Sequence, residues 1–205
     1  MSDGSATSTT TRPYRKRRRA ALEDETRLRI TEAAVDLHGS VGPARTTISA
    51  VAERAGVQRA TVYRHFPDEE ALFGACSAHW LASHPLPDIA AWAAIRDPDV
   101  RLATALDDLY AWYEDGEQML ERTTRDAALV PAMQPAVEGL TAWLAAATGT
   151  VVRGRRERGA RRRRVTAAIG HAASFHSWRS LVREQGLTHD EAVALMTGLV
   201  RAAGA

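Results

Sequence analysis

Residues 48–66 of the chain read ISAVAERAGVQRATVYRHF, and their pattern is that of a helix-turn-helix. This motif needs two short helices that cross steeply over a turn of three or four residues. Ala52 is the small residue that the close crossing needs in the first helix, and Gly56 tolerates a positive φ in the turn. Apolar residues fill the space between the helices: Val51, Ala55, Val57 and Val62. The stretch therefore predicts a DNA-reading module.

Further helices surround this motif. Apolar residues spaced by threes and fours predict an amphipathic helix from about Thr26 to the His38–Gly42 region, and the motif itself predicts helices near 46–55 and 58–66. Asp68 is expected to cap a fourth helix that runs to about Ser83. Beyond the break at His84-Pro85-Leu86-Pro87, the alanine- and leucine-rich sequence predicts helices near 88–96, 99–114, 117–129, 132–157, 161–185 and 188–203. Thr188 and Glu191 predict a capping box at the start of the last one.

Composition narrows the class of protein. The 205 residues are 45% apolar and contain no apolar stretch near the ~20 residues that span a bilayer. Neither a secretory signal nor a disulfide is expected, because no apolar block follows the N-terminal arginines and Cys76 is the single cysteine. These features favour a location in the cytoplasm, with no membrane contact.

Charge is distributed unevenly along the chain. Residues 1–20 carry six basic side chains against one acid, whereas the rest carries 21 basic against 24 acidic. We expect residues 1–20 to be a disordered basic arm that favours a polyanionic partner such as DNA, or else a merely solvated tail. If the arm binds DNA, deletion of residues 2–19 should weaken binding and flatten its salt dependence.

In the helix-turn-helix the sequence resembles the TetR family of bacterial repressors, from about Thr26 to Leu72. The quoted residues that carry the resemblance are Thr46-Thr47-Ile48, Val51-Ala52, Ala55-Gly56-Val57 and Thr61-Val62-Tyr63-Arg64-His65-Phe66. The resemblance implies an all-α fold of about nine helices. It implies a helix-turn-helix domain over 21–67 and a C-terminal ligand-binding and dimerisation domain over 68–205.

DNA contacts follow from the resemblance and from side-chain chemistry. The second helix of the motif would enter the major groove, where Gln58 can pair with adenine and Arg59 with guanine. Thr47 offers phosphate a hydroxyl, and Tyr63 and His65 match family positions that touch phosphates, with packing against the neighbouring helix as the alternative. The expected DNA-binding set is Arg45, Thr46, Thr47, Gln58, Arg59, Ala60, Thr61, Tyr63, Arg64 and His65. One position departs from the family, because Glu69 stands where many members carry a phosphate-binding lysine.

The C-terminal half contains many bulky side chains, and the sequence does not separate core, ligand-binding and interface roles for them. The candidates for a ligand pocket are Trp92, Trp112, Tyr113, Met133, Trp143, His171 and Phe175. The candidates for a dimer interface are Phe175, Trp178, Leu181, Val182, Leu195, Met196 and Leu199. An arginine run over 153–164 reads as a solvated loop and helix start, with a second DNA contact as the alternative.

Nothing in the sequence indicates an enzyme, a metal site or a cofactor. His171 and His176 are five residues apart and do not converge on one helix face, and no phosphate loop or nucleophile elbow appears. The sequence therefore predicts a homodimeric repressor that binds an inverted-repeat operator in double-stranded DNA and is released by a small-molecule inducer. The alternatives are a DNA-binding regulator without a ligand sensor, or an activator.

Overall fold

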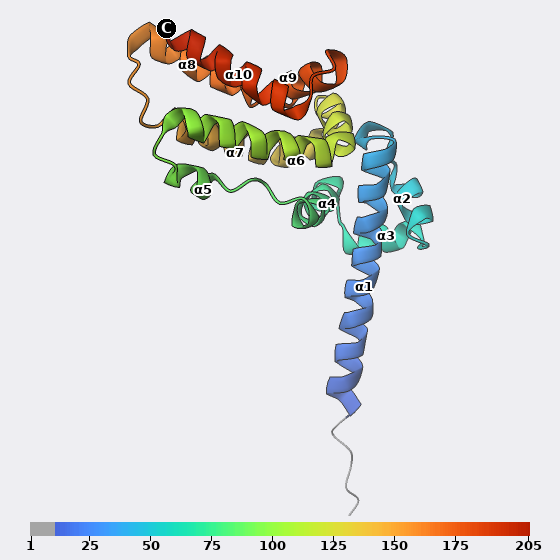
Figure 1. Ribbon diagram of the computed structural model, residues 1–205. Coiled ribbons are helices and arrows are strands. Elements are labelled where there is room, and N and C mark those ends of the chain that lie inside the picture. The colour runs from blue at the N-terminus through green and yellow to red at the C-terminus, as the bar shows by residue number, and fades with distance from the viewer. Residues whose placement is uncertain (1–10) are drawn as a thin grey trace, which may run out of the picture.

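The computed structural model describes residues 11–205, and this part of the chain forms ten α-helices and no strand (Figure 1). In chain order they are α1 (Thr11–Ser40), α2 (Ile48–Arg54), α3 (Arg59–His65), α4 (Glu69–Ser83), α5 (Ile89–Ala94), α6 (Pro98–Asp126), α7 (Gln134–Val152), α8 (Gly159–Ala172), α9 (Phe175–Arg179) and α10 (His189–Gly204). Two 3-10 turns, η1 (Pro43–Arg45) and η2 (Pro131–Met133), precede α2 and α7, and a π-helical turn, η3 (Ser180–Glu184), follows α9. The predicted all-α fold is confirmed. None of the described helices is both long and apolar enough to cross a membrane.

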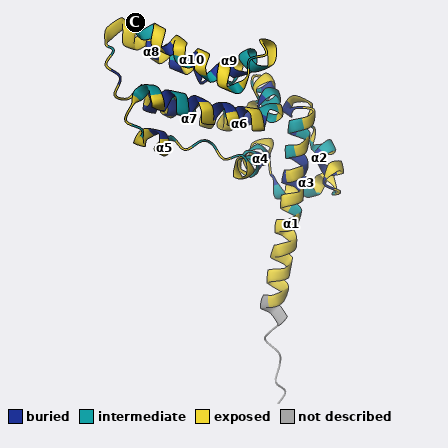
Figure 2. Ribbon diagram, in the orientation of Figure 1, coloured by how far each residue is buried: buried dark blue, intermediate teal, exposed yellow. Residues whose placement is uncertain are grey.

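The buried side chains form two cores. The first joins α1 to α4 and is centred on Ile30, Val51 and Val62, all of which are fully buried. The second lies among α5 to α10, where α10 packs on both α8 and α6. Figure 2 shows buried residues along α6, α7 and α10, whereas the N-terminal part of α1 is exposed.

Helix α1 begins earlier than the sequence predicts. Residues 11–20 of the expected disordered arm form its first turns, and residues 1–10 of that arm lie outside the described residues. Arginine, lysine and alanine are good helix formers, and Arg19 Nε donates to Glu23 Oε1 at 3.0 Å one turn further on. The basic residues from Arg15 to Arg19 are consequently presented on an exposed helix that projects away from the body of the molecule (Figure 1).

Helix α6 is continuous where the sequence predicts two helices, 99–114 and 117–129. Gly116 lies between the two predicted helices, but it is buried inside α6 against the Trp80 ring of α4. A Cβ atom at this position would lie 2.9 Å from Trp80 Cζ2. Gly116 therefore permits close packing of two helices and does not end α6.

The opposite difference occurs near the C-terminus, where the single helix predicted over 161–185 is divided into α8, α9 and η3. The division falls at Ala173 and Ser174. Tyr110 Oη donates to Ala172 O at 2.8 Å, and Tyr113 Oη donates to Ala173 O at 2.5 Å. These two buried hydroxyls need carbonyl groups that a continuous helix would occupy. The predicted capping box of α10 is present, with Thr188 and Glu191 bonding reciprocally.

The C-terminal end of α6 holds the connection between α1 and α2. We call this contact the α6 clasp and define it as Arg122, Arg125 and Asp126. Arg122 Nε donates to Gly39 O at 2.6 Å, and Asp126 Oδ2 accepts from Ala44 N at 3.0 Å. The clasp ties the second core to the segment that leads directly into the helix-turn-helix.

Candidate DNA-binding face and ligand cavity

The turn between α2 and α3 is built as the sequence predicts. Thr47 caps α2, its Oγ1 accepting from Ala50 N at 3.1 Å. Gly56 has φ +65°, a left-handed conformation that side chains other than glycine rarely adopt. Val57 N donates to Ala52 O at 2.9 Å and closes the turn. The local hydrogen bonds therefore fix the angle at which α3 leaves α2.

Packing holds α3 from behind. Val62 of α3 is fully buried with Val51 and Ala52 of α2, which confirms their predicted place in the core of the module. At the far end of α3, the Arg27 guanidinium of α1 stacks 4.2 Å from the centre of the Phe66 ring and donates to His65 O at 2.6 Å. Both ends of α3 are thus anchored, and its opposite side is free to face a ligand.

We call the exposed side of α3 together with its N-cap residue the reading face and define it as Gln58, Arg59, Ala60, Tyr63 and Arg64, all of which are exposed. Arg45 and Thr47 are also exposed, whereas Thr46, Thr61 and His65 are half-buried. The side chains of all ten predicted contacts lie on α3 or on the entrance to α2 and are at least partly accessible.

Two predicted contacts on α3 are already paired with each other. Arg59 Nη2 donates to Tyr63 Oη at 3.1 Å, and its guanidinium lies 5.6 Å from the centre of the Tyr63 ring. This pairing limits the rotamers of a long side chain before any partner arrives, which lowers the entropy lost on binding.

The His65 side chain is half-buried against the protein. Burial, followed by the charges of Arg64 and Arg27, lowers the pKa of His65 below its ordinary value. The side chain is therefore neutral at neutral pH, and its Nε2 is buried with no hydrogen-bond partner among the described residues. A neutral imidazole can meet a phosphate only as a hydrogen-bond donor, not as a cation.

The acidic start of α4 has a structural role. Asp68 Oδ1 accepts from Ala71 N at 2.7 Å and caps the helix, while Glu69 and Glu70 are exposed in the first turn. Negative side chains stabilise a helix N-terminus through the helix dipole. Asp68, Glu69 and Glu70 therefore stabilise the start of α4.

Comparison with known proteins agrees with this geometry. Residues 30–76, which span the end of α1 through most of α4, match the family described as bacterial regulatory proteins, tetR family. Over these residues the chain is similar to the TetR family. The matched residues include the whole helix-turn-helix, from α2 to α3.

Curated relatives match the same region. An HTH-type transcriptional repressor of Mycobacterium tuberculosis and an HTH-type transcriptional regulator of Mycobacterium bovis are each 39% identical to this chain over 71 residues. The match covers 34% of this chain and 38% of each relative. The similarity to these relatives is therefore confined to little more than a third of either protein.

Solved structures match over a longer span. A TetR-like transcriptional regulator from Rhodococcus sp. RHA1 gives a TM-score of 0.58 at 16% identity, covering 86% of this chain and 93% of that one. The transcriptional regulator FadR from Bacillus subtilis, solved in complex with stearoyl-CoA, gives 0.55 at 16% identity, covering 87% and 98%. At such identity the likeness extends the shared fold to the C-terminal helices and nothing more.

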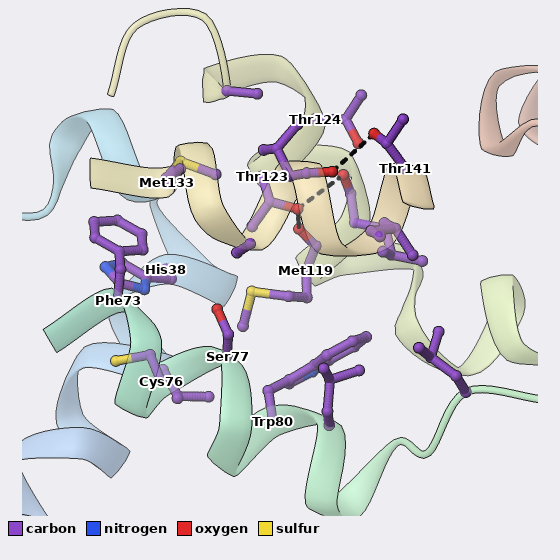
Figure 3. Close-up of a pocket in the computed structure, with 18 of the residues that line it drawn as sticks. His38, Phe73, Cys76, Ser77, Trp80, Met119, Thr123, Thr124, Met133 and Thr141 are labelled. Carbon is purple, nitrogen blue, oxygen red and sulfur yellow. Dashed lines mark hydrogen bonds between the residues drawn. The ribbon is translucent and has the colours of Figure 1, made fainter. Parts of the chain in front are cut away.

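The structure has a cavity of about 250 Å³ between its two cores (Figure 3). Its wall combines α1 and α4, which support the reading face, with α6 and α7 of the second core. Most of the wall is apolar, and none of its described residues is Asp, Glu, Lys or Arg. This volume lies just below the range of roughly 300–1,000 Å³ that is typical of ligand pockets.

Two of the predicted ligand-binding residues, Trp112 and Met133, line this cavity. The other five lie elsewhere: Trp92, Tyr113, Trp143, His171 and Phe175. Trp92 and Tyr113 are fully buried, and Trp92 Nε1 donates to Asp108 Oδ2 at 2.7 Å. The sequence offered these residues as pocket or core. The structure places Trp92, Tyr113, Trp143 and Phe175 in or against the second core, whereas His171 is exposed on α8.

Sequence reasoning missed most of the cavity wall, including His38 of α1 and Phe73, Cys76 and Trp80 of α4. One signal was present, because His38 falls four residues after the buried Ala34, on the apolar stripe of α1. A polar residue on a buried stripe is a candidate for a specific contact.

The predicted dimer residues divide into two groups. Trp178 and Met196 are buried within the chain, and the half-buried Phe175 packs on Tyr113 with ring centres 5.4 Å apart. Leu195 and Leu199, one turn apart on α10, are 43% and 50% exposed, and Leu181 and Val182 are half-buried. Within this set, the exposed large apolar side chains are those of Leu195 and Leu199 on the outer face of α10.

The arginine run is partly structural. Arg155 is buried, and its Nη2 donates to Pro98 O and to Asp99 Oδ1, each at 3.0 Å. The remaining arginines from Arg153 to Arg164 are exposed at the end of the molecule opposite the helix-turn-helix (Figure 1). Arg155 therefore fastens the loop between α7 and α8 to the start of α6.

One group of described side chains has the composition of a cation site. Ligand atoms of Asp107, His189 and Asp190 lie within 4.8 Å of one another. His189 Nε2 and Asp107 Oδ1 are already paired at 2.8 Å, and both aspartates are exposed. The contact between His189 at the start of α10 and Asp107 of α6 explains why these side chains lie together.

Proposed function

We propose that the chain is a cytoplasmic, dimeric repressor that binds an inverted-repeat operator and is released when a small molecule enters the cavity. The similarity of residues 30–76 to the TetR family supports DNA binding by the reading face. The observation that carries the release mechanism is the composition of the cavity wall, which takes two helices from each core.

The coupling would run through α1, α4 and the α6 clasp. Thr123 and Thr124 line the cavity, and the adjacent Arg122 and Arg125 hold the backbone just before η1. A molecule that moves this end of α6 would move the entrance to α2. A ligand that favours the moved state lowers operator affinity, and the operator lowers ligand affinity by the same factor.

DNA binding is tested by selecting bound fragments from genomic DNA and footprinting the best one. We expect a protected inverted repeat, with half-site centres separated by one helical turn or a multiple of it, about 34 Å per turn. Tyr63→Ala should reduce operator affinity roughly tenfold or more, because a phosphate contact and the support of Arg59 are both lost. Since Tyr63 is exposed, the melting temperature should stay near that of the wild type.

Leu129→Ala is the matched control, because Leu129 is 70% exposed and lies away from α3. Operator affinity should be unchanged in this variant. Weak binding that ignores sequence, disappears with salt and is insensitive to Tyr63→Ala would contradict the proposal.

A further inference from the structure

The wall of the cavity restricts the charge of what can bind there. Its polar side chains include His38, Ser77, Thr123 and Thr141, none of which carries a fixed charge (Figure 3). A carboxylate or phosphate in an apolar enclosure is expensive unless a cation or several donors compensate it. No described lining residue is a lysine or an arginine. The cavity is therefore suited to an uncharged occupant.

The hydroxyl protons of two lining threonines are already used. Thr123 Oγ1 donates to Met119 O at 2.8 Å, and Thr141 Oγ1 donates to Val137 O at 2.8 Å. Each of these bonds lies within a single helix, so these two hydroxyls have no proton left to donate to a ligand.

His38 differs from these threonines. Its side chain is only 4% exposed, and its ring stacks on Phe73 with centres 4.5 Å apart and planes 7° from parallel. No hydrogen bond joins its ring nitrogens to another described residue, although a buried polar group usually has a partner. Burial lowers the pKa of His38 to about 4, so the imidazole is neutral at physiological pH. A neutral imidazole offers one donor and one acceptor.

We propose that the cavity takes an uncharged, mainly apolar small molecule that carries a hydroxyl or carbonyl group, and that His38 binds this group. The inference rests on the proposed function for the biological role of the site, but the binding chemistry stands on its own. A molecule without the polar group leaves the imidazole unpaired, and a molecule with a carboxylate buries an uncompensated charge. Both are therefore discriminated against.

The experiment uses the full chain and the uncharged fluorescent probe N-phenyl-1-naphthylamine, which is displaced at pH 8 by octan-1-ol or by octanoate. These competitors share an alkyl length and differ in charge. We expect octan-1-ol to displace the probe at a concentration at least tenfold lower than octanoate does.

The role of His38 is tested with His38→Phe, which keeps an aromatic ring against Phe73 and removes both nitrogens. Its affinity for octan-1-ol should fall about tenfold, the size expected for one hydrogen bond left unmade. His38→Gln retains a donor and an acceptor and should recover most of the loss. His79→Phe makes the same chemical change on α4 outside the cavity wall and should leave octan-1-ol binding unchanged.

Equal displacement by octanoate and octan-1-ol, or failure of octan-1-ol to displace the probe, would overturn the uncharged-ligand inference. Unchanged octan-1-ol affinity in a folded His38→Phe variant would overturn the role of His38. Operator affinity is measured separately with octan-1-ol at saturation. If binding depends on His38 while operator affinity does not change, the inference stands and the release mechanism of the proposed function is rejected.

Discussion

Asp126 is a buried carboxylate, and its neighbours explain how it remains charged. The hydrogen bond from Arg125, 2.7 Å between Nε and Oδ1, is the main reason that the pKa of Asp126 lies below its usual range. The Ala44 amide donates to its other oxygen. Gly42 makes room for this arrangement, because it adopts φ +97° and a Cβ there would collide with Arg125 and Asp126.

Replacement of Asp126 by Asn should lower the free energy of unfolding by about 1–3 kcal/mol at neutral pH, since a charge-assisted bond is lost in a buried place. A carboxyl with a lowered folded pKa stabilises the protein above its ordinary pKa and loses this effect as the pH falls through the folded value. The difference between wild type and Asp126→Asn should therefore shrink in acid, as measured by urea unfolding over a pH series. Asp24→Asn, on the exposed part of α1, is the control and should have little effect. A difference for Asp126→Asn that does not change with pH would disprove the ion-pair role.

Two helical glycines, Gly116 in α6 and Gly139 in α7, differ in the space around them. Replacement by alanine should therefore change the free energy of unfolding in opposite directions. Gly116→Ala should destabilise the chain by about 1–3 kcal/mol, because the new Cβ meets the Trp80 ring and the overpacking outweighs the better helix propensity of alanine. Gly139→Ala in α7 has open space around it and should stabilise the chain by up to about 1 kcal/mol. Thermal and urea unfolding of the two variants measure these changes in stability. A stabilising Gly116→Ala would mean that α4 and α6 are not closely packed in solution.

Local sequence predicted the helix-turn-helix well, because Thr47, Gly56 and Val62 act on neighbours within the motif. It failed where long-range contacts decide the outcome. The continuity of α6 at Gly116 depends on Trp80, and the division after Ala172 depends on the hydroxyls of Tyr110 and Tyr113. Residues so distant in sequence leave no trace in helical periodicity.

The candidate site was predictable to a similar extent. The reading face follows from the motif, since its residues occupy consecutive turns of one short helix. The cavity was not predictable, because its wall joins side chains of four helices, and only Trp112 and Met133 were selected for their size. His38 lies on α1, the helix that packs against the helix-turn-helix, and its sequence pattern indicates a role in that core and not a ligand contact.

Considered as a whole molecule, the chain exposes on α10 a pair of leucines that suits a symmetric interface. Leu199→Arg should convert a dimer to monomers in sedimentation experiments, because it buries an unpaired charge against the partner copy. Operator affinity should fall when the dimer is lost, since a monomer binds one half-site at a time. Leu129→Arg, on a more exposed leucine away from α10, should leave the sedimentation coefficient unchanged. A Leu199→Arg variant that remains dimeric would assign the interface to another surface.

One continuous helix, α1, joins three regions of the molecule: the basic residues near Arg15, the core of the DNA-reading module around Ile30, and the cavity wall at His38. A rigid helix of this length can act as a lever. The stretch from Arg15 to Ile30 spans about 22 Å of helix, so a tilt of about 10° with Ile30 as pivot would carry Arg15 roughly 4 Å sideways. A small displacement at the histidine would then be magnified at the arginines, and a molecule lodged beside His38 would change where the cationic tip falls along the duplex.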